Sequence, residues 1–228
     1  YIELPRDVIY LPVTPYQQTR EEKQPSEAEA LQEALEEATD IINAAKKPVI
    51  IAGVELHRFG LQKMLLGLLE NTKIPVACTL LSKAVIRENH PQYLGVYEGA
   101  MGREEVRKYV ETSDCLILLG TFMSDINLGI FTAHLDQGRS IYVTSEKVSI
   151  HYHTYEGVNM EDFIRGLLKA NIRCQEDIDI PRPPSPESPN PVFGKQISVE
   201  YLFQRLNSFL DDGTAVIADP GDAMFAAI

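Results

Sequence analysis

The sequence predicts an α/β fold in which a mainly parallel sheet lies between layers of helices. Short apolar runs with strand character alternate with stretches whose apolar residues recur at helical spacing, a pattern typical of such layered folds. The runs at 48–53 and 115–120 show no apolar–polar alternation, which indicates strands covered on both faces. Each of these runs ends in a glycine, Gly53 or Gly120, where a strand meets a turn.

The amino-terminal part is predicted to be a linker followed by a helix. Residues 6–25 carry prolines, glutamines and charged side chains, and we interpret them as a linker that runs over a surface. Ser26, with Glu29 three residues later, predicts a capping box that satisfies two backbone donors at a helix start. The expected helix carries an apolar stripe formed by Leu31, Leu35, Ala38, Ile42 and Ala45.

The central part is predicted to continue the alternation of strands and helices. Four strands are expected, at 48–53, 74–78, 115–120 and 141–144. Three helices are expected between and after them, at 61–69, 103–111 and 160–168. The stretch from 79 to 101 has no regular pattern, so we expect a long irregular connection there.

The carboxyl-terminal part is predicted to hold a second linker and the start of another unit. Residues 176–197 are dense in proline, which favours a stiff extended spacer. A helix at 199–210, a strand at 215–219 and a turn at 220–222 are expected after it. Residues 1–5 resemble a strand that has already begun, and residues 226–228 resemble the first residues of a helix. We therefore interpret both ends as cut from a longer chain.

Composition restricts the classes of function. The 228 residues are 44% hydrophobic with a formal net charge of −12. This profile is typical of globular proteins, and its charge repels phosphate backbones, so no nucleic-acid partner is expected. No apolar run approaches the roughly 18 residues of a membrane helix. Three cysteines at irregular spacings favour a reducing, cytoplasmic location, and Cys78 and Cys115 are expected to be inert core residues.

The residues by themselves leave the function of the central part open. Ligands of parallel sheets bind outside the carboxyl ends of strands, so the turns after Gly53 and Gly120 are candidates for nucleotide binding. Neither turn has the G-x-G-x-x-G spacing, and tight strand-to-helix turns are the alternative interpretation. His151 and His153 lack a third ligand at a plausible spacing, so we expect surface or edge histidines and no metal site.

Several phrases taken together resemble the thiamine-diphosphate-dependent enzymes, in particular the pyruvate and indolepyruvate decarboxylase branch. The phrase at 55–62, which contains His57-Arg58-Phe59, and the phrase at 88–99 are similar to that branch specifically. Further phrases follow in the order of the family, at 1–8, 47–53, 113–120, 125–127 and 218–225. The resemblance therefore covers the chain from end to end.

The resemblance implies a division of the chain into four parts. These are the end of the pyrimidine-binding domain with a linker at 1–25, a central domain with a Rossmann-like sheet at 26–175, a proline-rich linker at 176–197, and the start of the pyrophosphate-binding domain at 198–228. The catalytic glutamate and the metal-holding G-D-G motif of the family would lie outside these residues. No catalytic residue and no metal ligand is therefore expected here, and the chain alone is expected to be inactive.

The resemblance also implies a small set of site residues. Pro220, Gly221 and Asp222 would lie beside the diphosphate of the cofactor. The family often has threonine or glutamine where this chain has Pro220, so a side-chain hydrogen bond is not expected at that position. Met224 would line the substrate pocket, with core packing as the alternative.

The implied parent enzyme is a non-oxidative 2-oxo acid decarboxylase that forms an aldehyde and carbon dioxide. It would bind thiamine diphosphate, which acts as the electron sink, and magnesium, which anchors the diphosphate. The missing pyrimidine- and pyrophosphate-binding domains would complete it, as a homodimer or tetramer, and the central domain would support assembly. Two alternatives are an acetolactate-synthase-like carboligase with flavin or nucleotide in the central domain, and a non-catalytic nucleotide-binding module.

Overall fold

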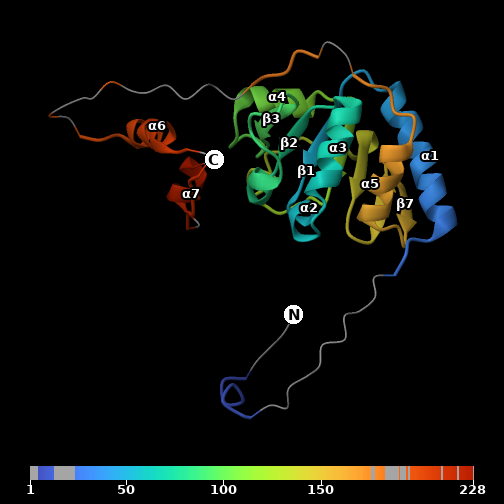
Figure 1. Cartoon of the computed structure of the whole chain (residues 1–228), viewed down its shortest axis with the longest axis horizontal. Coiled ribbons are helices and arrows are strands. Elements are labelled where there is room, and N and C mark those ends of the chain that lie inside the picture. The colour runs from blue at the N-terminus through green and yellow to red at the C-terminus, as the bar shows by residue number, and fades with distance from the viewer. Residues whose placement is uncertain are drawn as a thin grey trace.

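A computed structural model of the chain describes residues 5–12, 24–175, 178–182, 190, 194, 196–211, 213–219 and 221–227. At its centre is a seven-stranded sheet in the order β3-β2-β1-β4-β5-β6-β7 (Figure 1). The first five strands pair in parallel and the last two form an antiparallel hairpin at one edge. The strands are β1 Pro48–Ala52, β2 Val76–Cys78, β3 Tyr93–Val96, β4 Cys115–Leu119, β5 Ser140–Val143, β6 Lys147–Ile150 and β7 His153–Glu156.

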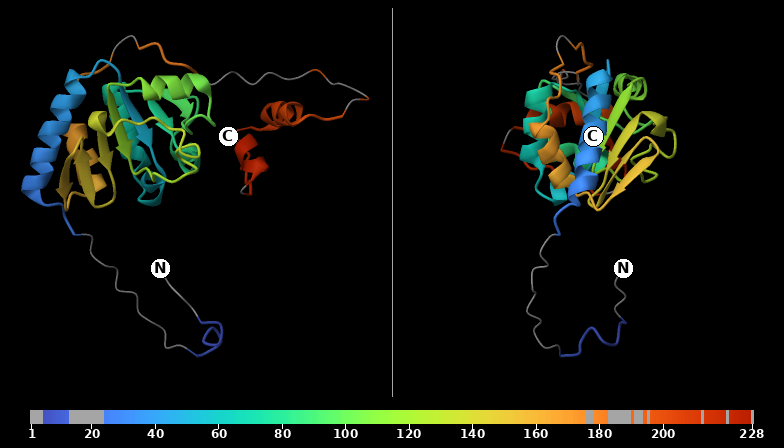
Figure 2. Two further views of the ribbon diagram at one scale, coloured as in Figure 1. Left: turned by 180° about the vertical axis from the view of Figure 1, so that it is seen from behind. Right: turned by 90° about the vertical axis from the view of Figure 1, so that its right-hand side faces the viewer.

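Helices cover both faces of this sheet, which confirms the predicted α/β architecture (Figure 2). The connections of the sheet and its flanking segments hold α1 Ala28–Ala44, α2 Val54–Arg58, α3 Gln62–Thr72, α4 Glu104–Glu111 and α5 Met160–Lys169. Two 3-10 helices, η1 Leu80–Val85 and η2 Gln137–Arg139, lie in longer loops. The carboxyl-terminal part adds α6 Val199–Phe209 and α7 Asp222–Ala226.

Strand β1 shows why the predicted strands lack alternation. Ile50 belongs to the core beneath α1, α3 and α5, whereas its neighbours Val49 and Ile51 belong to the core beneath α4. All five residues of β1 are buried, as are all five of β4. Because successive side chains of a strand point to opposite faces, a strand covered on both faces is apolar at every position.

The expected irregular connection at 79–101 is wrong, because this stretch contains η1 and the edge strand β3. Strand β3 is only four residues long and includes Gly95, with φ +134°, and its pairing with β2 shifts register. The β6–β7 hairpin was also not predicted. Its turn places His151 at φ +52° and lacks the usual asparagine–glycine or aspartate–glycine signal.

The predicted capping box at Ser26 and Glu29 is wrong as well. Helix α1 begins after Glu27, and no side chain caps it. The Ser26 hydroxyl instead donates to Asp162 Oδ2 over 2.7 Å and accepts from the Asn159 backbone N–H over 2.9 Å. Ser26 therefore ties the start of α1 to the start of α5, a contact across more than 130 positions that local sequence does not reveal.

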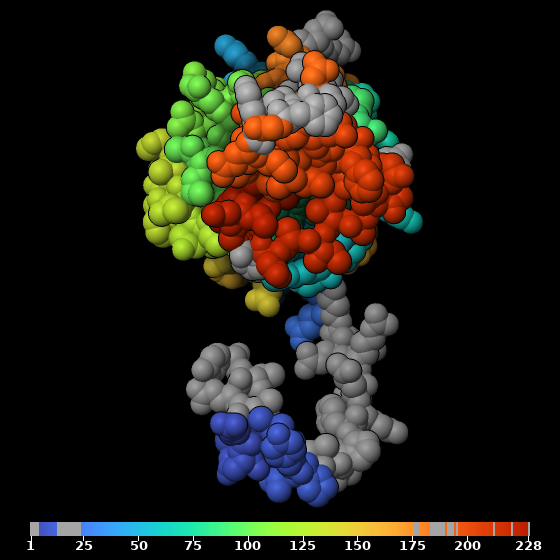
Figure 3. All heavy atoms as spheres, turned by 90° about the vertical axis from the view of Figure 1, so that its left-hand side faces the viewer, coloured from blue at the N-terminus to red at the C-terminus, as the bar shows by residue number. Residues whose placement is uncertain are grey.

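The expected strand at 215–219 is not formed, although these residues are described. Val216 and Ile217 are exposed, and no strand in the described part of the chain pairs with them. Helix α6 is as predicted, but none of its residues is buried. Figure 3 shows α6 and α7 on the side of the molecule where β3 and α4 lie in Figure 1. The expected strand at 1–5 and the linker at 176–197 lie mostly outside the described residues.

Candidate functional site

The sheet reverses its strand order between β1 and β4, and the two predicted glycine turns meet at this point. Strands β2 and β3 extend from one side of β1, whereas β4 and β5 extend from the other. The Gly53 N–H donates to the Leu119 carbonyl over 2.8 Å, and the Glu55 N–H donates to the Gly120 carbonyl over 3.2 Å. A crevice at such a switch point is the usual ligand site of open parallel sheets.

Gly53 and Gly120 are required by backbone packing. A β-carbon on Gly53 would lie 2.0 Å from the Gly120 carbonyl oxygen, which no side chain tolerates. Gly120 itself has φ +62°, a region that favours glycine. The contact is between two turns of the protein, so the glycines are explained without a bound phosphate.

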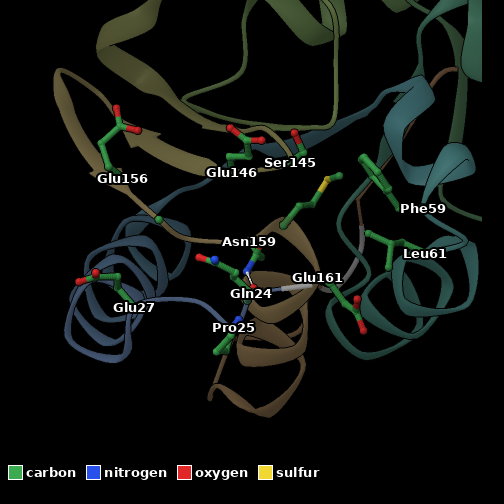
Figure 4. Close-up of a pocket in the computed structure, with 12 residues that line it drawn as sticks. Gln24, Pro25, Glu27, Phe59, Leu61, Ser145, Glu146, Glu156, Asn159 and Glu161 are labelled. Carbon is green, nitrogen blue, oxygen red and sulfur yellow. Dashed lines mark hydrogen bonds between the residues drawn. The ribbon is translucent and has the colours of Figure 1, made fainter. Parts of the chain in front are cut away.

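A cavity of about 1230 Å³ opens beside this point, at the carboxyl ends of the strands (Figure 4). Its walls come from the segment before α1, the link between α2 and α3, the β5–β6 turn and the start of α5. The lining residues are Gln24, Pro25, Glu27, Phe59, Leu61, Ser145, Glu146, Glu156, Gly157, Asn159, Met160 and Glu161. In Figure 4 Phe59 and Leu61 lie on one side of the hollow together with Glu161, whereas Glu27, Glu146 and Glu156 lie on its other sides.

The cavity is acidic. Four of its described lining residues are glutamates and none of them is lysine, arginine or histidine. Lys147 and Arg165 pair with Glu156 and Glu161 without lining the cavity, and Glu27 and Glu146 have no ion pair with any described residue. The described glutamates outnumber the cations paired with them, so this lining disfavours an anion such as the diphosphate of a dinucleotide or of FAD.

Glu55 strengthens this negative character just behind the crevice. Its carboxyl is buried, and desolvation is the main cause that raises its pKa, with the charge of Glu146 adding to the shift. Arg58 and a hydrogen bond from the Ser145 backbone act in the opposite direction. A carboxyl buried beside the turn of Gly53 disfavours a second negative charge at this helix start.

The sequence-predicted site residues lie elsewhere, in the carboxyl-terminal segment. Gly221 has φ +127° and precedes α7, whose first residue, Asp222, is exposed. Met224 is half-buried on the same helix, and Pro220 lies outside the described residues. None of these residues lines the acidic cavity.

The described residues contain no group of three or more histidine, cysteine, aspartate or glutamate side chains arranged to hold a metal ion. Helix α7 carries one carboxylate, Asp222, and no cationic residue. His151 occupies the β6–β7 turn and His153 is exposed, which confirms them as edge histidines.

The prediction that Cys78 and Cys115 are inert core residues is confirmed. Cys78 and Cys115 lie buried in β2 and β4, and burial raises the pKa of each thiol to about 12. Neither is therefore a nucleophile at neutral pH. No helix in the described part of the chain is both long enough and apolar enough to cross a membrane.

The acidic cavity itself was not predicted from sequence. Its residues come from four separate segments that only the fold brings together. One signal was present, because Ser145 and Glu146 directly follow the predicted strand at 141–144, where a ligand site of a parallel sheet is expected. Glu156 belongs to the hairpin that the sequence did not reveal.

Fold and site together define a Rossmann-like α/β domain with an acidic cavity beside the point where its strand order reverses. The chain belongs to the thiamine pyrophosphate enzyme family, since the family's central domain matches residues 35–170. The domain is therefore the middle one of that family's enzymes.

The relatives of the chain are decarboxylases. It is 31% identical over 203 residues to pyruvate decarboxylase isozyme 2 of Saccharomyces cerevisiae. That alignment covers 88% of this chain and 36% of the yeast protein. It is 26% identical to indole-3-pyruvate decarboxylase of Azospirillum brasilense, over 100% of this chain and 42% of that protein. The chain thus spans well under half the length of these relatives.

A solved structure shows the same fold. Benzoylformate decarboxylase from Polynucleobacter necessarius superposes with a TM-score of 0.55 at 16% sequence identity. The superposition covers 79% of this chain and 34% of that one.

Proposed function

We propose that the chain is the central domain of a thiamine-diphosphate- and magnesium-dependent, non-oxidative 2-oxo acid decarboxylase, which converts a 2-oxo acid to an aldehyde and carbon dioxide. The observation that carries the proposal is the family match at 35–170, supported by decarboxylase relatives that align over 88–100% of this chain. When bound, the cofactor supplies the electron sink for loss of carbon dioxide. This chain's own residues supply a scaffold for the domains around them.

The scaffold role is supported by the crevice between β1 and β4. Four glutamates line the adjoining cavity, and the close approach of Gly53 to Gly120 is satisfied by the protein itself. Both features disfavour the flavin-binding carboligase and the nucleotide-binding module, because each of these needs a phosphate at this point.

The parent enzyme would place this domain between two others. In this proposal residues 1–25 end the pyrimidine-binding domain, 26–175 form the central domain, 176–197 link it onward, and 198–228 begin the pyrophosphate-binding domain. Pro220, Gly221 and Asp222 would approach the cofactor diphosphate, and Met224 would approach the substrate. The enzyme would be a cytoplasmic homodimer or tetramer, with catalytic and metal-binding groups outside this chain.

A domain exchange tests the proposal. A chimera would carry this chain in place of the aligned 203 residues of the yeast pyruvate decarboxylase isozyme 2. We expect aldehyde formation from pyruvate or indolepyruvate that depends on thiamine diphosphate and magnesium. The matched control is the same chimera with Gly53→Val, which disrupts the packing of the two turns and should abolish activity together with folding. A folded chimera without any decarboxylase activity contradicts the proposal.

Ligand binding and activity of the isolated 228-residue protein give the second half of the test. Calorimetric titration of the 228-residue protein with thiamine diphosphate plus magnesium, FAD and ADP should show no binding, and no 2-oxo acid should be decarboxylated. Tight binding of FAD or ADP would support the carboligase or the nucleotide-binding module instead. Decarboxylation by the chain alone would refute the scaffold role.

A further inference from the structure

The turn at 98–103, which follows β3, and the loop at 121–133, which follows β4, lie against each other. The Ala100 N–H donates to the Thr132 hydroxyl oxygen over 2.8 Å. The same hydroxyl donates to the Gly129 carbonyl over 2.6 Å. Thr132 therefore links the turn to the loop, which is drawn in yellow-green in the left view of Figure 2.

These two segments concentrate the unmet polar groups of the domain. Five buried side-chain nitrogen or oxygen atoms have no hydrogen-bond partner among the described residues, and four of them belong to the turn or the loop. The four are Glu98 Oε1, Arg103 Nη1, Thr121 Oγ1 and Asn127 Oδ1. Because a buried polar atom without a partner costs free energy, the turn and the loop are less stable than the sheet they follow.

The loop also carries backbone strain. Ile130 has φ +53° and Phe131 has φ +62°, in the left-handed region that disfavours residues with a β-carbon. Their side chains are 65% and 73% exposed, so burial of apolar surface does little to offset the strain. Strain and unmet polar groups together mark a segment that opens locally before the buried core does.

Glu98 makes this weakness sensitive to pH. It is 5% exposed, and its own carbonyl oxygen lies so close to Gly129 that a β-carbon there would be 2.2 Å away. Desolvation is the only cause that raises the pKa of its carboxyl, so neither Arg103 in the turn nor Asp125 and His134 on the other side contributes. An ionised carboxylate is disfavoured in such a place, and it reaches water only if the turn separates from its neighbours.

We propose that the turn at 98–103 and the loop at 121–133 form a pH-sensitive device, closed while Glu98 is protonated and opened when Glu98 ionises. The opening is local. The Tyr97 N–H donates to the Cys78 carbonyl over 2.8 Å and holds the end of β3, and β1 and β4 are buried at every position. The device does not depend on the proposed decarboxylase function.

The direction of the effect follows from proton linkage. In the open form the Glu98 carboxyl titrates at its ordinary value of 4.5, whereas in the closed form its pKa is raised. Opening therefore releases a proton. The open population should rise by up to about tenfold per pH unit above 4.5 and level off once the pH exceeds the closed-form pKa.

Hydrogen exchange of the full chain, followed by NMR from pH 4 to pH 8, tests the proposal. Each rate is divided by the intrinsic exchange rate at the same pH to give a protection factor. The Ala100 amide donates to Thr132, and the Thr132 amide donates to the Leu128 carbonyl over 3.0 Å. We expect the protection factors of both to fall by at least about tenfold as the pH rises, while amides of β1 and β4 keep theirs.

Two matched variants assign the effect. Glu98→Gln should abolish the pH dependence and keep both amides protected, because an amide side chain does not ionise. Glu105→Gln, an exposed glutamate on the neighbouring helix α4, should behave like the parent. Constant protection from pH 4 to pH 8 in the parent chain would overturn the proposal. An equal fall in Glu98→Gln would overturn it as well, since the fall would then belong to another group such as His134.

Discussion

The α-carbon of Gly53 lies so close to Gly120 that a β-carbon there would be 2.0 Å from the Gly120 carbonyl oxygen. The same added atom would lie 2.3 Å from the Gly120 carbonyl carbon and 2.4 Å from the Thr121 α-carbon. All three neighbours are backbone atoms, which cannot move aside without disturbing β4. This contact joins the two turns at the switch point of the sheet, where ligands of open parallel sheets bind.

Gly53→Ala should therefore be among the most damaging single substitutions in the domain. We expect a loss of more than about 3 kcal/mol in unfolding free energy, or failure to fold. The added β-carbon would clash with backbone atoms, which cannot move without distorting the strand end. Urea denaturation followed by circular dichroism measures the effect. Gly60→Ala is the control, since Gly60 has φ +69° but open space around its α-carbon and should lose only about 1–2 kcal/mol. Equal losses in the two variants would contradict the packing argument.

The sequence was informative where burial was complete. Strands β1 and β4 are apolar at every position because both faces are covered, and this pattern leaves little ambiguity. Strand β3 and the β6–β7 hairpin escaped prediction because each strand has only four residues, too few to reveal a period. The strand expected at 215–219 shows the converse, since apolar residues form no strand without a neighbouring strand to pair with.

Contacts between distant segments were beyond sequence reasoning. Ser26 with Glu29 matched the local capping pattern, yet Ser26 serves α5, which begins more than 130 positions later. The acidic cavity depends likewise on glutamates from separate segments. In the sequence, these glutamates look like solvent-exposed loop or helix residues. Nothing in their neighbouring residues indicates that they line the same cavity.

Ser26→Ala should destabilise the domain by about 1–2 kcal/mol. The change removes a hydrogen bond to the Asp162 carboxylate and leaves the Asn159 N–H without its acceptor. Glu29→Gln should change stability by less than about 0.5 kcal/mol, because Glu29 makes no capping bond and acts only through the helix dipole. Urea denaturation of both variants measures the difference. A larger loss of unfolding free energy for Glu29→Gln than for Ser26→Ala would support the capping box instead.

Glu98→Gln should stabilise the protein at neutral pH. Glu98 is 5% exposed, its Oε1 has no hydrogen-bond partner among the described residues, and desolvation raises the pKa of its carboxyl. The folded state therefore binds this proton more tightly than the unfolded chain does. The contribution of Glu98 to stability is fully present below the ordinary value of 4.5 and is lost as the pH rises through the folded-state pKa.

The stability gain of Glu98→Gln should accordingly grow with pH, from near zero at pH 4 to about 1–3 kcal/mol at pH 8. Urea denaturation across this range measures it. Glu105→Gln, an exposed glutamate on α4, is the control and should show no such trend. A stability gain that does not depend on pH would contradict the prediction. It would mean that the Glu98 carboxyl has the same protonation state in the folded and the unfolded protein.

Met224→Ala distinguishes a substrate contact from core packing. Under the proposed function the change enlarges the substrate pocket of the yeast chimera. We expect the ratio of kcat/KM for indolepyruvate to that for pyruvate to rise about tenfold, with thermal stability unchanged. Met101→Ala, an exposed methionine in the central domain, should alter neither quantity. A lower melting temperature at an unchanged ratio would assign Met224 to packing.

The three thiols should divide into one reactive and two inert groups. Burial raises the pKa of Cys78 and Cys115 to about 12, so at pH 8 almost no thiolate forms at either, whereas Cys174 is exposed. A disulfide reagent such as Ellman's reagent should therefore modify one thiol per native chain and all three in denaturant. Cys174→Ser should reduce the native count to zero. A second thiol reacting as fast as Cys174 in the native protein would mean that β2 or β4 opens readily, which is at odds with two central strands buried on both faces.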